Sequence, residues 1–387
     1  MAAEELPECT AAELHARLRQ QCDNPKGGEL LVLDVRSPES FARGAIQGAP
    51  LLRNLHSTQF LADPAAALAA LPETKQIVVV CNHGNSSKQV TRELRARGRD
   101  AVSVRGGMAA WGELLVAREA ARIGEAAILQ FDHVGKGCLS YLLQTPAGSW
   151  AVDPARHIEP YLAAVAAHGA PLRRVLDTHA HADHISGGRE LAQRAGVSYW
   201  LHPFDALSPC DLTPAAFAFE PLWEGQRERL DGLEIRVLHT PGHTLGQVSL
   251  LVNEAYLLTG DTVLLRSVGR PDLGGHAEAW SRRLHATLRA LAALPDDLLV
   301  LPCHCAAPGE ARADGVYAAR LGDLRLANEA LAPRGEDEFV AYIQAGLSEV
   351  PAAYRAIKRL NLGLEEADQA RRDELQMGKN LCALSHA

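Results

Sequence analysis

The order of apolar and polar positions divides the first third of the chain into short strands that alternate with helices. Residues 29–34 and 76–81 are near-continuous apolar runs, which are typical of buried strands. Thr10 precedes a helical pattern and can cap that helix, and a second helix is expected over residues 87–97. Strands that alternate with helices predict a small parallel α/β sheet.

A longer series of strands follows. The stretch from Trp111 to Gly124 is rich in Ala, Glu and Arg, so it is expected to be helical and to contain a domain boundary near residue 120. Further strand-like runs are found at residues 127–131, 138–144, 150–152, 174–177, 197–201, 233–238, 247–252 and 256–259. These runs predict two packed sheets flanked by helices.

The pattern becomes helical and more charged from about residue 317, with Pro333 and Pro351 as breaks. The expected organisation is therefore a first domain over residues 1–120, a second over 121–345, and a helical extension or tail over 346–387. A chain of 387 residues is long enough for two domains that each bury a core.

Composition narrows the classes of function. Hydrophobic residues make up 47% of the chain and charged residues 22%, and the net charge of -8 comes from interspersed signs. The absence of a basic stripe argues against nucleic-acid partners, and no apolar run is long enough for a membrane span. The acidic start and the dispersed cysteines lead us to expect a cytoplasmic, reducing location.

Residues 178–184 read Thr-His-Ala-His-Ala-Asp-His directly after an apolar run. Neutral imidazole is the commonest metal ligand in proteins, and further ligand types follow later strand-like runs at His243, Asp261 and His304. This ordered set predicts a metal centre rather than a solvated histidine loop.

These residues resemble the metallo-β-lactamase superfamily from about residue 128 to about residue 312. The resemblance implies an αββα sandwich followed by C-terminal helices. Because that superfamily holds both hydrolases and oxygen-using enzymes, the fold alone does not define the reaction.

Two mechanisms fit the ligand inventory. The first is hydrolysis of a glutathione thioester at a dinuclear site, as in glyoxalase II, where zinc or mixed metals generate hydroxide. One metal would be held by His179, His181, His243 and Asp261, and the other by Asp183, His184, Asp261 and His304.

The second mechanism is oxidation of a persulfide. The segment from Gly260 to Leu273 resembles the ethylmalonic encephalopathy protein-like family of persulfide dioxygenases. That resemblance implies one Fe(II) per chain on His179, His243 and Asp261, with O2 as co-substrate. The substrate would be glutathione persulfide or another thiol persulfide, and the product would be sulfite. In this scheme the residues that tune the site without holding a second metal are His181, Asp183, His184 and His304.

Two features near the metal motifs bear on the substrate. Arg270 is the candidate for binding a substrate carboxylate or for organising its loop through Asp272. The sequence also continues His304-Cys305-Ala306, where relatives with glutathione-linked substrates often have His-Asp-Tyr, so the thiol carrier stays open. Packed thiols are expected at Cys303 and Cys305.

Cys81 lies at the end of a predicted strand and before a predicted helix. Backbone N–H groups at a helix start stabilise a thiolate or persulfide, and the expected sulfur-anion cradle comprises Asn82, His83, Gly84, Asn85, Ser86 and Ser87. Together with Leu33–Arg36, Gly44–Ala49 and Arg105–Trp111, this loop resembles the rhodanese family over residues 10–115. The resemblance implies that Cys81 carries sulfane sulfur as a persulfide.

Ser86 and Ala45 stand where many rhodaneses have arginine and histidine. Loss of a fixed cation weakens attraction for thiosulfate, which favours a thiol persulfide as donor. We expect Cys81 either to deliver sulfur to a small thiol for oxidation or to transfer it to sulfite, forming thiosulfate. The alternatives are a noncatalytic docking or sulfur-sensing module attached to a dioxygenase or to the hydrolase. A homodimer is possible by resemblance.

Overall fold

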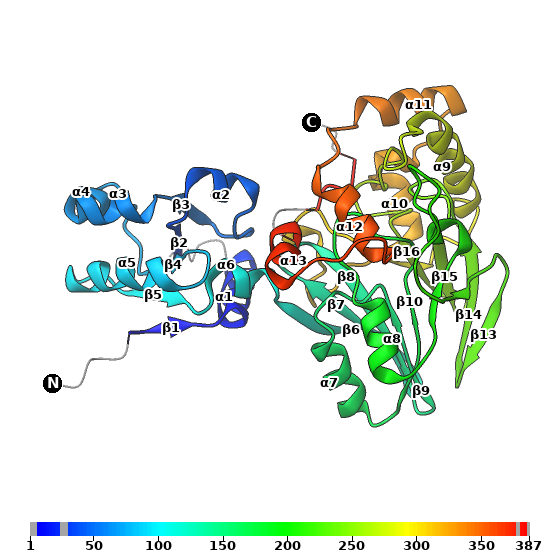
Figure 1. Cartoon of the computed structure of the whole chain (residues 1–387), viewed down its shortest axis with the longest axis horizontal. Coiled ribbons are helices and arrows are strands. Elements are labelled where there is room, and N and C mark those ends of the chain that lie inside the picture. The colour runs from blue at the N-terminus through cyan, green and yellow to red at the C-terminus, as the bar shows by residue number, and fades with distance from the viewer. Residues whose placement is uncertain (1–5, 24–29, 377–379, 385–387) are drawn as a thin grey trace.

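The structure is a computed structural model that describes residues 6–23, 30–376 and 380–384. It has two lobes, with the first third of the chain in one and the remainder in the other (Figure 1). Within the described residues, no helix has the length and apolar character needed to cross a bilayer.

The first lobe is a five-stranded parallel sheet in the order β1-β5-β4-β2-β3. Its strands are β1 (Glu8–Cys9), β2 (Leu30–Asp34), β3 (Leu51–Asn54), β4 (Gln76–Val80) and β5 (Ala101–Val104). Its helices are α1 (Ala11–Asp23), α2 (Pro38–Arg43), α3 (Ser57–Ala62), α4 (Pro64–Ala69), α5 (Asn85–Ala96) and α6 (Gly107–Gly112). Two apolar clusters use alternate residues of the buried strands β2 and β4, so this sheet has a core on each face.

Helix α1 begins as expected at Thr10. The Thr10 hydroxyl accepts a bond from Glu13 N at 3.1 Å, while Glu13 Oε2 accepts one from Thr10 N at 2.7 Å. This reciprocal capping box satisfies two backbone donors at the helix start.

The second lobe contains the two packed sheets that the sequence predicts. One has the order β12-β11-β10-β9-β8-β7-β6 and the other β13-β14-β15-β16-β17-β18. The first comprises β6 (Leu115–Ile123), β7 (Ala126–His133), β8 (Cys138–Thr145), β9 (Gly148–Val152), β10 (Leu172–Leu176), β11 (Tyr199–Leu201) and β12 (Glu220–Pro221). The second comprises β13 (Arg227–Leu230), β14 (Leu233–His239), β15 (Val248–Val252), β16 (Tyr256–Gly260), β17 (Leu299–Pro302) and β18 (Ala319–Arg320).

Helices cover both outer faces of this sandwich (Figure 1). Those on the first sheet are α7 (Glu159–His168) and α8 (Gly188–Ala195), and those on the second are α9 (Ala277–Leu291), α10 (Leu321–Ala327) and α11 (Glu336–Ala345). The largest apolar cluster joins residues of both sheets, including Ile128, Leu143 and Leu250. The expected αββα sandwich with C-terminal helices is therefore confirmed.

The helix expected between Trp111 and Gly124 is wrong. Residues Leu115–Ile123 form strand β6, which pairs antiparallel with β7 across a turn at Gly124, where φ is 60°. Ala, Glu and Arg favour helices locally, but pairing with β7 in the hairpin, from Ile123 with Ala126 to Leu115 with His133, overrides that weak preference. The sheets of the second lobe thus begin at Leu115, ahead of the boundary expected near residue 120.

The C-terminal segment is packed against the second domain. Helices α12 (Ala353–Asn361) and α13 (Gln369–Gln376) follow α11, and Ile357 and Leu375 bury against Ile185. Beyond them, Arg270 N donates to Cys382 O at 2.8 Å. The segment expected as an extension or tail therefore forms one wall of the region around residues 178–184.

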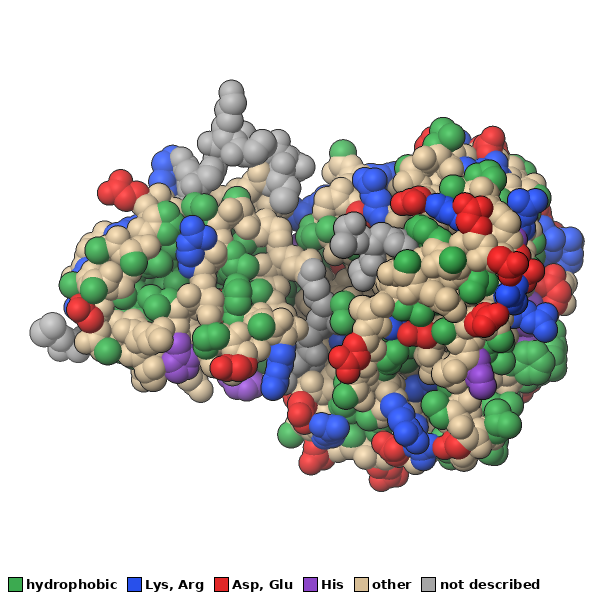
Figure 2. All heavy atoms as spheres, turned by 90° about the horizontal axis from the view of Figure 1, so that it is seen from above, with side chains coloured by type: hydrophobic (Ala, Val, Ile, Leu, Met, Phe, Trp, Pro, Cys, Tyr) green, Lys and Arg blue, Asp and Glu red, His purple; other side chains and the backbone are tan. Residues whose placement is uncertain are grey.

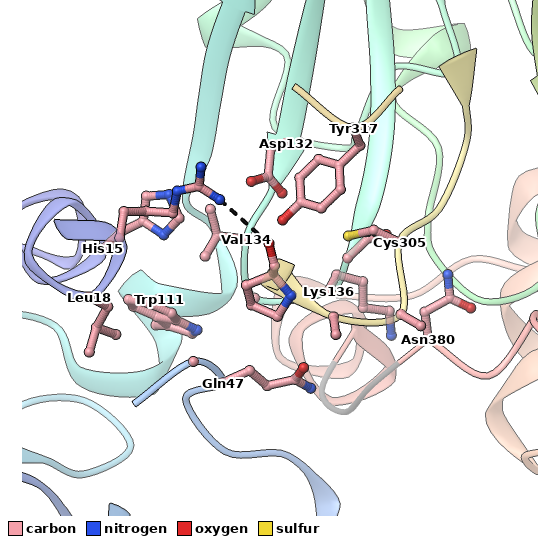
Figure 3. A pocket seen from close by; sticks show the side chains of 17 residues that line it. His15, Leu18, Gln47, Trp111, Asp132, Val134, Lys136, Cys305, Tyr317 and Asn380 are labelled. Atoms are coloured by element: carbon pink, nitrogen blue, oxygen red, sulfur yellow. Dashed lines mark hydrogen bonds between the residues drawn. The ribbon is translucent and has the colours of Figure 1, made fainter. Parts of the chain in front are cut away.

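The junction between the lobes contains a small cavity (Figure 3). His15, Trp111 and Gln47 approach it from the first lobe, whereas Asp132 and Tyr317 approach it from the second. Asp132 is 3% exposed, and burial raises the pKa of this carboxyl to about 6, against the opposing effect of Arg118 at 3.7 Å.

This pKa predicts the pH dependence of stability. As pH rises from about 4 to about 6, Asp132 ionises in the unfolded chain before it ionises in the folded one, so its contribution to the free energy of unfolding falls by up to about 3 kcal/mol. An Asp132→Asn variant cannot ionise, and its stability relative to the unaltered protein should rise across that window. Urea unfolding at several pH values tests this, and a constant difference from pH 4 to pH 7 would contradict it.

Candidate metal centre and cysteine loop

The predicted metal ligands meet at one edge of the sandwich. His179 follows β10, His243 follows β14, Asp261 follows β16 and His304 follows β17. Strands β14, β16 and β17 run in the same direction because both β14 and β16 are antiparallel to β15, and β17 is parallel to β16. Side chains distant in sequence are thus brought to the same end of the sheet.

Three ligand atoms converge without any protein partner. Asp261 Oδ2 lies 3.8 Å from His179 Nε2 and 3.4 Å from His243 Nε2, and each of these buried atoms lacks a hydrogen bond. Burial lowers the pKa of His179 and of His243, which keeps both lone pairs available. Because unpaired buried polar atoms are costly, this set fits a cation held by two histidines and one carboxylate.

The opposite ring nitrogen of each histidine is fixed. His243 Nδ1 lies 2.9 Å from the carbonyl of Arg270, and His179 Nδ1 lies 3.1 Å from the Thr178 hydroxyl. Such outer contacts set ring orientation in metal sites. They direct the two Nε2 atoms toward Asp261.

A second cluster lies beside the first but is largely paired within itself. His304 Nδ1 contacts Asp261 Oδ1, and His304 Nε2 lies 3.0 Å from Asp183 Oδ2. His184 Nδ1 lies 3.1 Å from Asp183, and Cys138 Sγ lies 3.5 Å from His184 Nδ1. Cys138, Asp183, His184 and His304 could also hold a metal by their spacing, and His304 Nε2 makes no hydrogen bond. Asp183, however, already forms ion pairs with both His184 and His304.

His181 is separate from the three-residue group. Its Nε2 lies 3.2 Å from Asp153 Oδ1, and its Nδ1 has no partner. Asp153 also accepts bonds from the backbone N–H and hydroxyl of Thr178. Asp153 therefore holds the loop that carries the first three histidines.

Four contributors to this site were not foreseen from the sequence: Cys138, Asp153, Asp205 and Asn361. Asp153 directly follows strand β9, a position that carries ligands elsewhere in this chain, so a signal existed for it. Asn361 on α12 donates to the carbonyls of His181 and His184, both at 2.9 Å. No local pattern connects residue 361 with the loop at residue 181.

Asp205 joins the loop of His179 to the loop of His243. It accepts bonds from Ala180 N at 2.8 Å, Thr244 Oγ1 at 2.7 Å and Gly246 N at 2.9 Å. Asp205→Ala should loosen both loops and weaken metal retention about 10-fold to 100-fold, with partial rescue by Asp205→Asn. Competition with a chelator measures this, and unchanged retention in the alanine variant would refute the positioning role.

Arg270 is committed to protein contacts. Its Nε and Nη2 donate to the two carboxylate oxygens of Asp272 at 2.7 and 2.8 Å, and it also contacts Ser348 and the carbonyl of Leu381. The side chain is 1% exposed. Of its two expected roles, this geometry supports organisation of the loop and does not support substrate binding.

The flanking cysteines behave as packed thiols. Burial raises the pKa of both Cys303 and Cys305, so neither is poised as a thiolate. Cys303 N and Cys305 N bond the carbonyls of Gly260 and Gly137 at 3.0 and 2.9 Å, which fixes His304 between the two sheets.

The Cys81 loop forms a compact anion cradle. Cys81 Sγ accepts a bond from Gly84 N at 3.2 Å and lies 3.3 Å from Ser87 Oγ. Although burial opposes ionisation, Ser87 and the backbone N–H groups of residues 83 and 84 lower the pKa of the Cys81 thiol. Gly84 has φ of 90°, and a Cβ there would lie 3.2 Å from Gly106 N, so this turn requires glycine.

The remaining residues of the Cys81 loop differ in exposure and in whether they contact the sulfur. Asn82, His83 and Asn85 are exposed and Ser86 is half-buried. Of the expected cradle residues, Gly84 N and the Ser87 hydroxyl lie 3.2 and 3.3 Å from the sulfur. Arg36, whose motif supported the rhodanese resemblance, makes a buried ion pair with Asp34 and donates to Gly44 O. It thereby shapes the wall beside the loop.

The geometry defines a metal-binding αββα domain preceded by a small domain with a thiol cradle. Residues 134–304 match the metallo-beta-lactamase superfamily, and residues 10–114 match the rhodanese-like domain. A hydroxyacylglutathione hydrolase of Acidiphilium cryptum is 34% identical over 232 residues, which cover 57% of this chain and 90% of that protein. The chain belongs to the metallo-beta-lactamase superfamily and carries a rhodanese-like domain ahead of it.

Solved structures agree on the fold. A metallo-beta-lactamase from Staphylococcus aureus superposes with a TM-score of 0.52 at 20% identity, covering 64% of this chain and 72% of that one. The ETHE1 protein of Myxococcus xanthus superposes with a TM-score of 0.50 at 24% identity, covering 64% and 99%. Membership of the superfamily implies metal binding, and the buried ligand clusters fit it.

Proposed function

We propose that the second domain is a persulfide dioxygenase with one Fe(II) on His179, His243 and Asp261. The observation that carries this proposal is the contrast between the two ligand clusters. Asp261 Oδ2 and the Nε2 atoms of His179 and His243 are buried, make no hydrogen bond and lie 3.4 to 3.8 Å apart. In the second cluster His304 Nε2 also makes no hydrogen bond, but Asp183 lies 3.0 Å from it and 3.1 Å from His184 Nδ1. Two histidines and one carboxylate are the ligand set of iron enzymes that use oxygen.

The proposed reaction balances without another oxidant. Glutathione persulfide, O2 and water give glutathione and sulfurous acid, with four electrons passing from the sulfane sulfur to O2. When bound, ferrous iron would supply open positions for the substrate sulfur and for dioxygen. The protein residues orient the ligands through Thr178 and the Arg270 carbonyl, and they exclude bulk water because the ligand side chains are fully buried.

We further propose that Cys81 carries sulfane sulfur as a persulfide, and that this sulfur transfer is coupled to the persulfide oxidation in the second domain. The lowered thiol pKa and the cradle of Gly84 and Ser87 suit a persulfide anion. A tethered persulfide-forming domain raises the effective concentration of an intermediate shared with a persulfide-oxidising one. Glutathione-related substrates of the Acidiphilium relative are compatible with a thiol persulfide.

A thioester hydrolase is the second candidate. It is favoured by the 34% identity to a hydroxyacylglutathione hydrolase, and by His181 Nδ1 and His304 Nε2, which are buried and make no hydrogen bond. Hydrolysis at a dinuclear site needs Asp183, His184 and His304 as ligands of a second metal. Their mutual pairing and the contact of Cys138 with His184 count against it.

Anaerobic purification with metal counting separates the two. The dioxygenase should contain about one iron per chain, consume O2 with glutathione persulfide and release sulfite. Lactoylglutathione should not be cleaved. Two metals per chain, thioester cleavage and no oxygen uptake would establish the hydrolase instead.

A further inference from the structure

A cavity of about 240 Å³ lies between the two domains, next to the Cys81 loop. The first domain contributes Arg43 and the two residues that follow the cysteine, Asn82 and His83. The second domain contributes Lys136 and Arg156. The cavity is slightly smaller than the range of roughly 300–1,000 Å³ typical of small-molecule sites, which suits a small thiol and not a protein partner.

The walls of this cavity carry an excess of positive charge. Arg36, Arg43, Lys136 and Arg156 line it, against the two carboxylates of Glu113 and Asp373. Arg36 is paired with Asp34, and Arg156 is paired with Asp373. Among the described residues, neither Arg43 nor Lys136 has a carboxylate partner in a salt bridge.

Lys136 is a buried cation at the junction. It is 6% exposed, and its Nζ donates to the carbonyl of Gln376 at 3.2 Å. Lys136 also lines the smaller cavity of about 50 Å³ beside it, where it lies near Asn380 (Figure 3). A desolvated ammonium with spare donors favours an anionic ligand.

Charges of both signs are scattered over the visible face of the second lobe (Figure 2). Within the interdomain cavity, by contrast, four cations face two carboxylates, and Asn82 and His83 of the Cys81 loop form part of the same wall.

We propose that this cavity binds the carboxylate-bearing small thiol that exchanges sulfane sulfur with Cys81, and that Lys136 of the second domain binds its carboxylate. The proposal rests on the sulfur transfer proposed for Cys81. The thiolate of the acceptor attacks the outer sulfur of the Cys81 persulfide, the sulfur–sulfur bond to Cys81 breaks, and Cys81 leaves as a thiolate. The exchange is redox-neutral and reversible.

Single-turnover discharge tests the assignment. Cys81 is loaded with sulfane sulfur from inorganic polysulfide, excess polysulfide is removed, and discharge is followed with glutathione or with uncharged 2-mercaptoethanol. Lys136→Met should raise the glutathione concentration for half-maximal discharge about tenfold, the loss expected for one charge-assisted hydrogen bond. Discharge to 2-mercaptoethanol should be unchanged, and Lys136→Arg should restore most of the glutathione response.

Two controls keep the outcomes distinct. Lys88→Met removes a lysine that pairs with Glu8 outside the cavity, and it should leave both acceptors unaffected. Calorimetric binding of S-methylglutathione, which cannot accept sulfur, should weaken in Lys136→Met even if no transfer occurs. Equal changes with both acceptors, or unchanged binding and discharge, would overturn the site, whereas failure of the unaltered protein to load sulfur would overturn the transfer itself.

Discussion

Replacing Asp261 with alanine is expected to empty the metal centre and reduce oxygen consumption to background, a loss well above 100-fold. Asp261 is the only carboxylate in the unpartnered group, and its Oδ2 faces both His179 Nε2 and His243 Nε2. Changing outer contacts of a metal ligand already costs about 10-fold to 100-fold in affinity or activity. Loss of the anionic ligand itself should cost more. Metal content by mass spectrometry and oxygen uptake with glutathione persulfide measure the two effects.

Matched variants distinguish the proposed ligands from their neighbours. His179→Ala and His243→Ala should behave like Asp261→Ala, because each removes one of the three convergent atoms. His184→Ala should be milder, since His184 Nδ1 contacts Asp183 and Cys138 and lies outside that group. Thermal unfolding identifies variants that have lost the fold. A folded Asp261→Ala protein that retains iron and activity would refute the three-residue ligand set.

The loops that carry the expected metal ligands could be located from the sequence, because each one is marked by a local pattern of polar residues after an apolar strand. Each of His179, His243 and Asp261 lies in a short polar segment after an apolar run, and strands of like direction bring such segments together. The second cluster depends on a contact between sheets. Cys138 begins β8 and forms an isolated bridge with His304, so its place beside His184 arises only when the sandwich closes.

Strand β6 is a case in which the local sequence pattern predicts the wrong element. Its residues favour a helix by intrinsic preference, yet Ala117 pairs with Phe131 and Ile123 with Ala126 in an antiparallel hairpin. Pairing and burial of alternate side chains outweigh a preference of a few tenths of a kcal/mol per residue. The burial of Arg270 could not be predicted from the sequence either. Its contacts Ser348 and Leu381 lie far away in the C-terminal segment.

The position of the Cys81 loop was predicted from the sequence, but the residues of the second domain that lie beside it were not. Apolar runs and the glycine turn indicate a thiol at a helix start, as observed. Lys136 and Arg156, which approach the same cavity, belong to loops of the other domain, and no sequence pattern links them to residue 81. Separate resemblances to two families cannot define how the two domains face each other.

Cys81→Ser is expected to abolish sulfane-sulfur transfer while iron content and oxygen uptake with added glutathione persulfide persist. Serine cannot form a persulfide. The metal ligands lie in the other domain, and among the described residues none of them hydrogen-bonds to the Cys81 loop. Cys210→Ser is the matched control, because Cys210 is an exposed free thiol. Mass spectrometry should detect added sulfur on the control and none at residue 81 of the variant.

The pH dependence of thiol alkylation gives an independent test of the cradle. Since Ser87 and the backbone N–H groups of residues 83 and 84 lower the pKa of Cys81, its alkylation should reach half its maximal rate below the pH found for an ordinary cysteine, about 8.5. Ser87→Ala removes the hydroxyl 3.3 Å from Sγ and should move that midpoint upward. An unshifted midpoint, together with unchanged sulfur transfer and products in Cys81→Ser, would make the first domain a docking module, because a persulfide carrier requires both the thiolate and the residue that bears it.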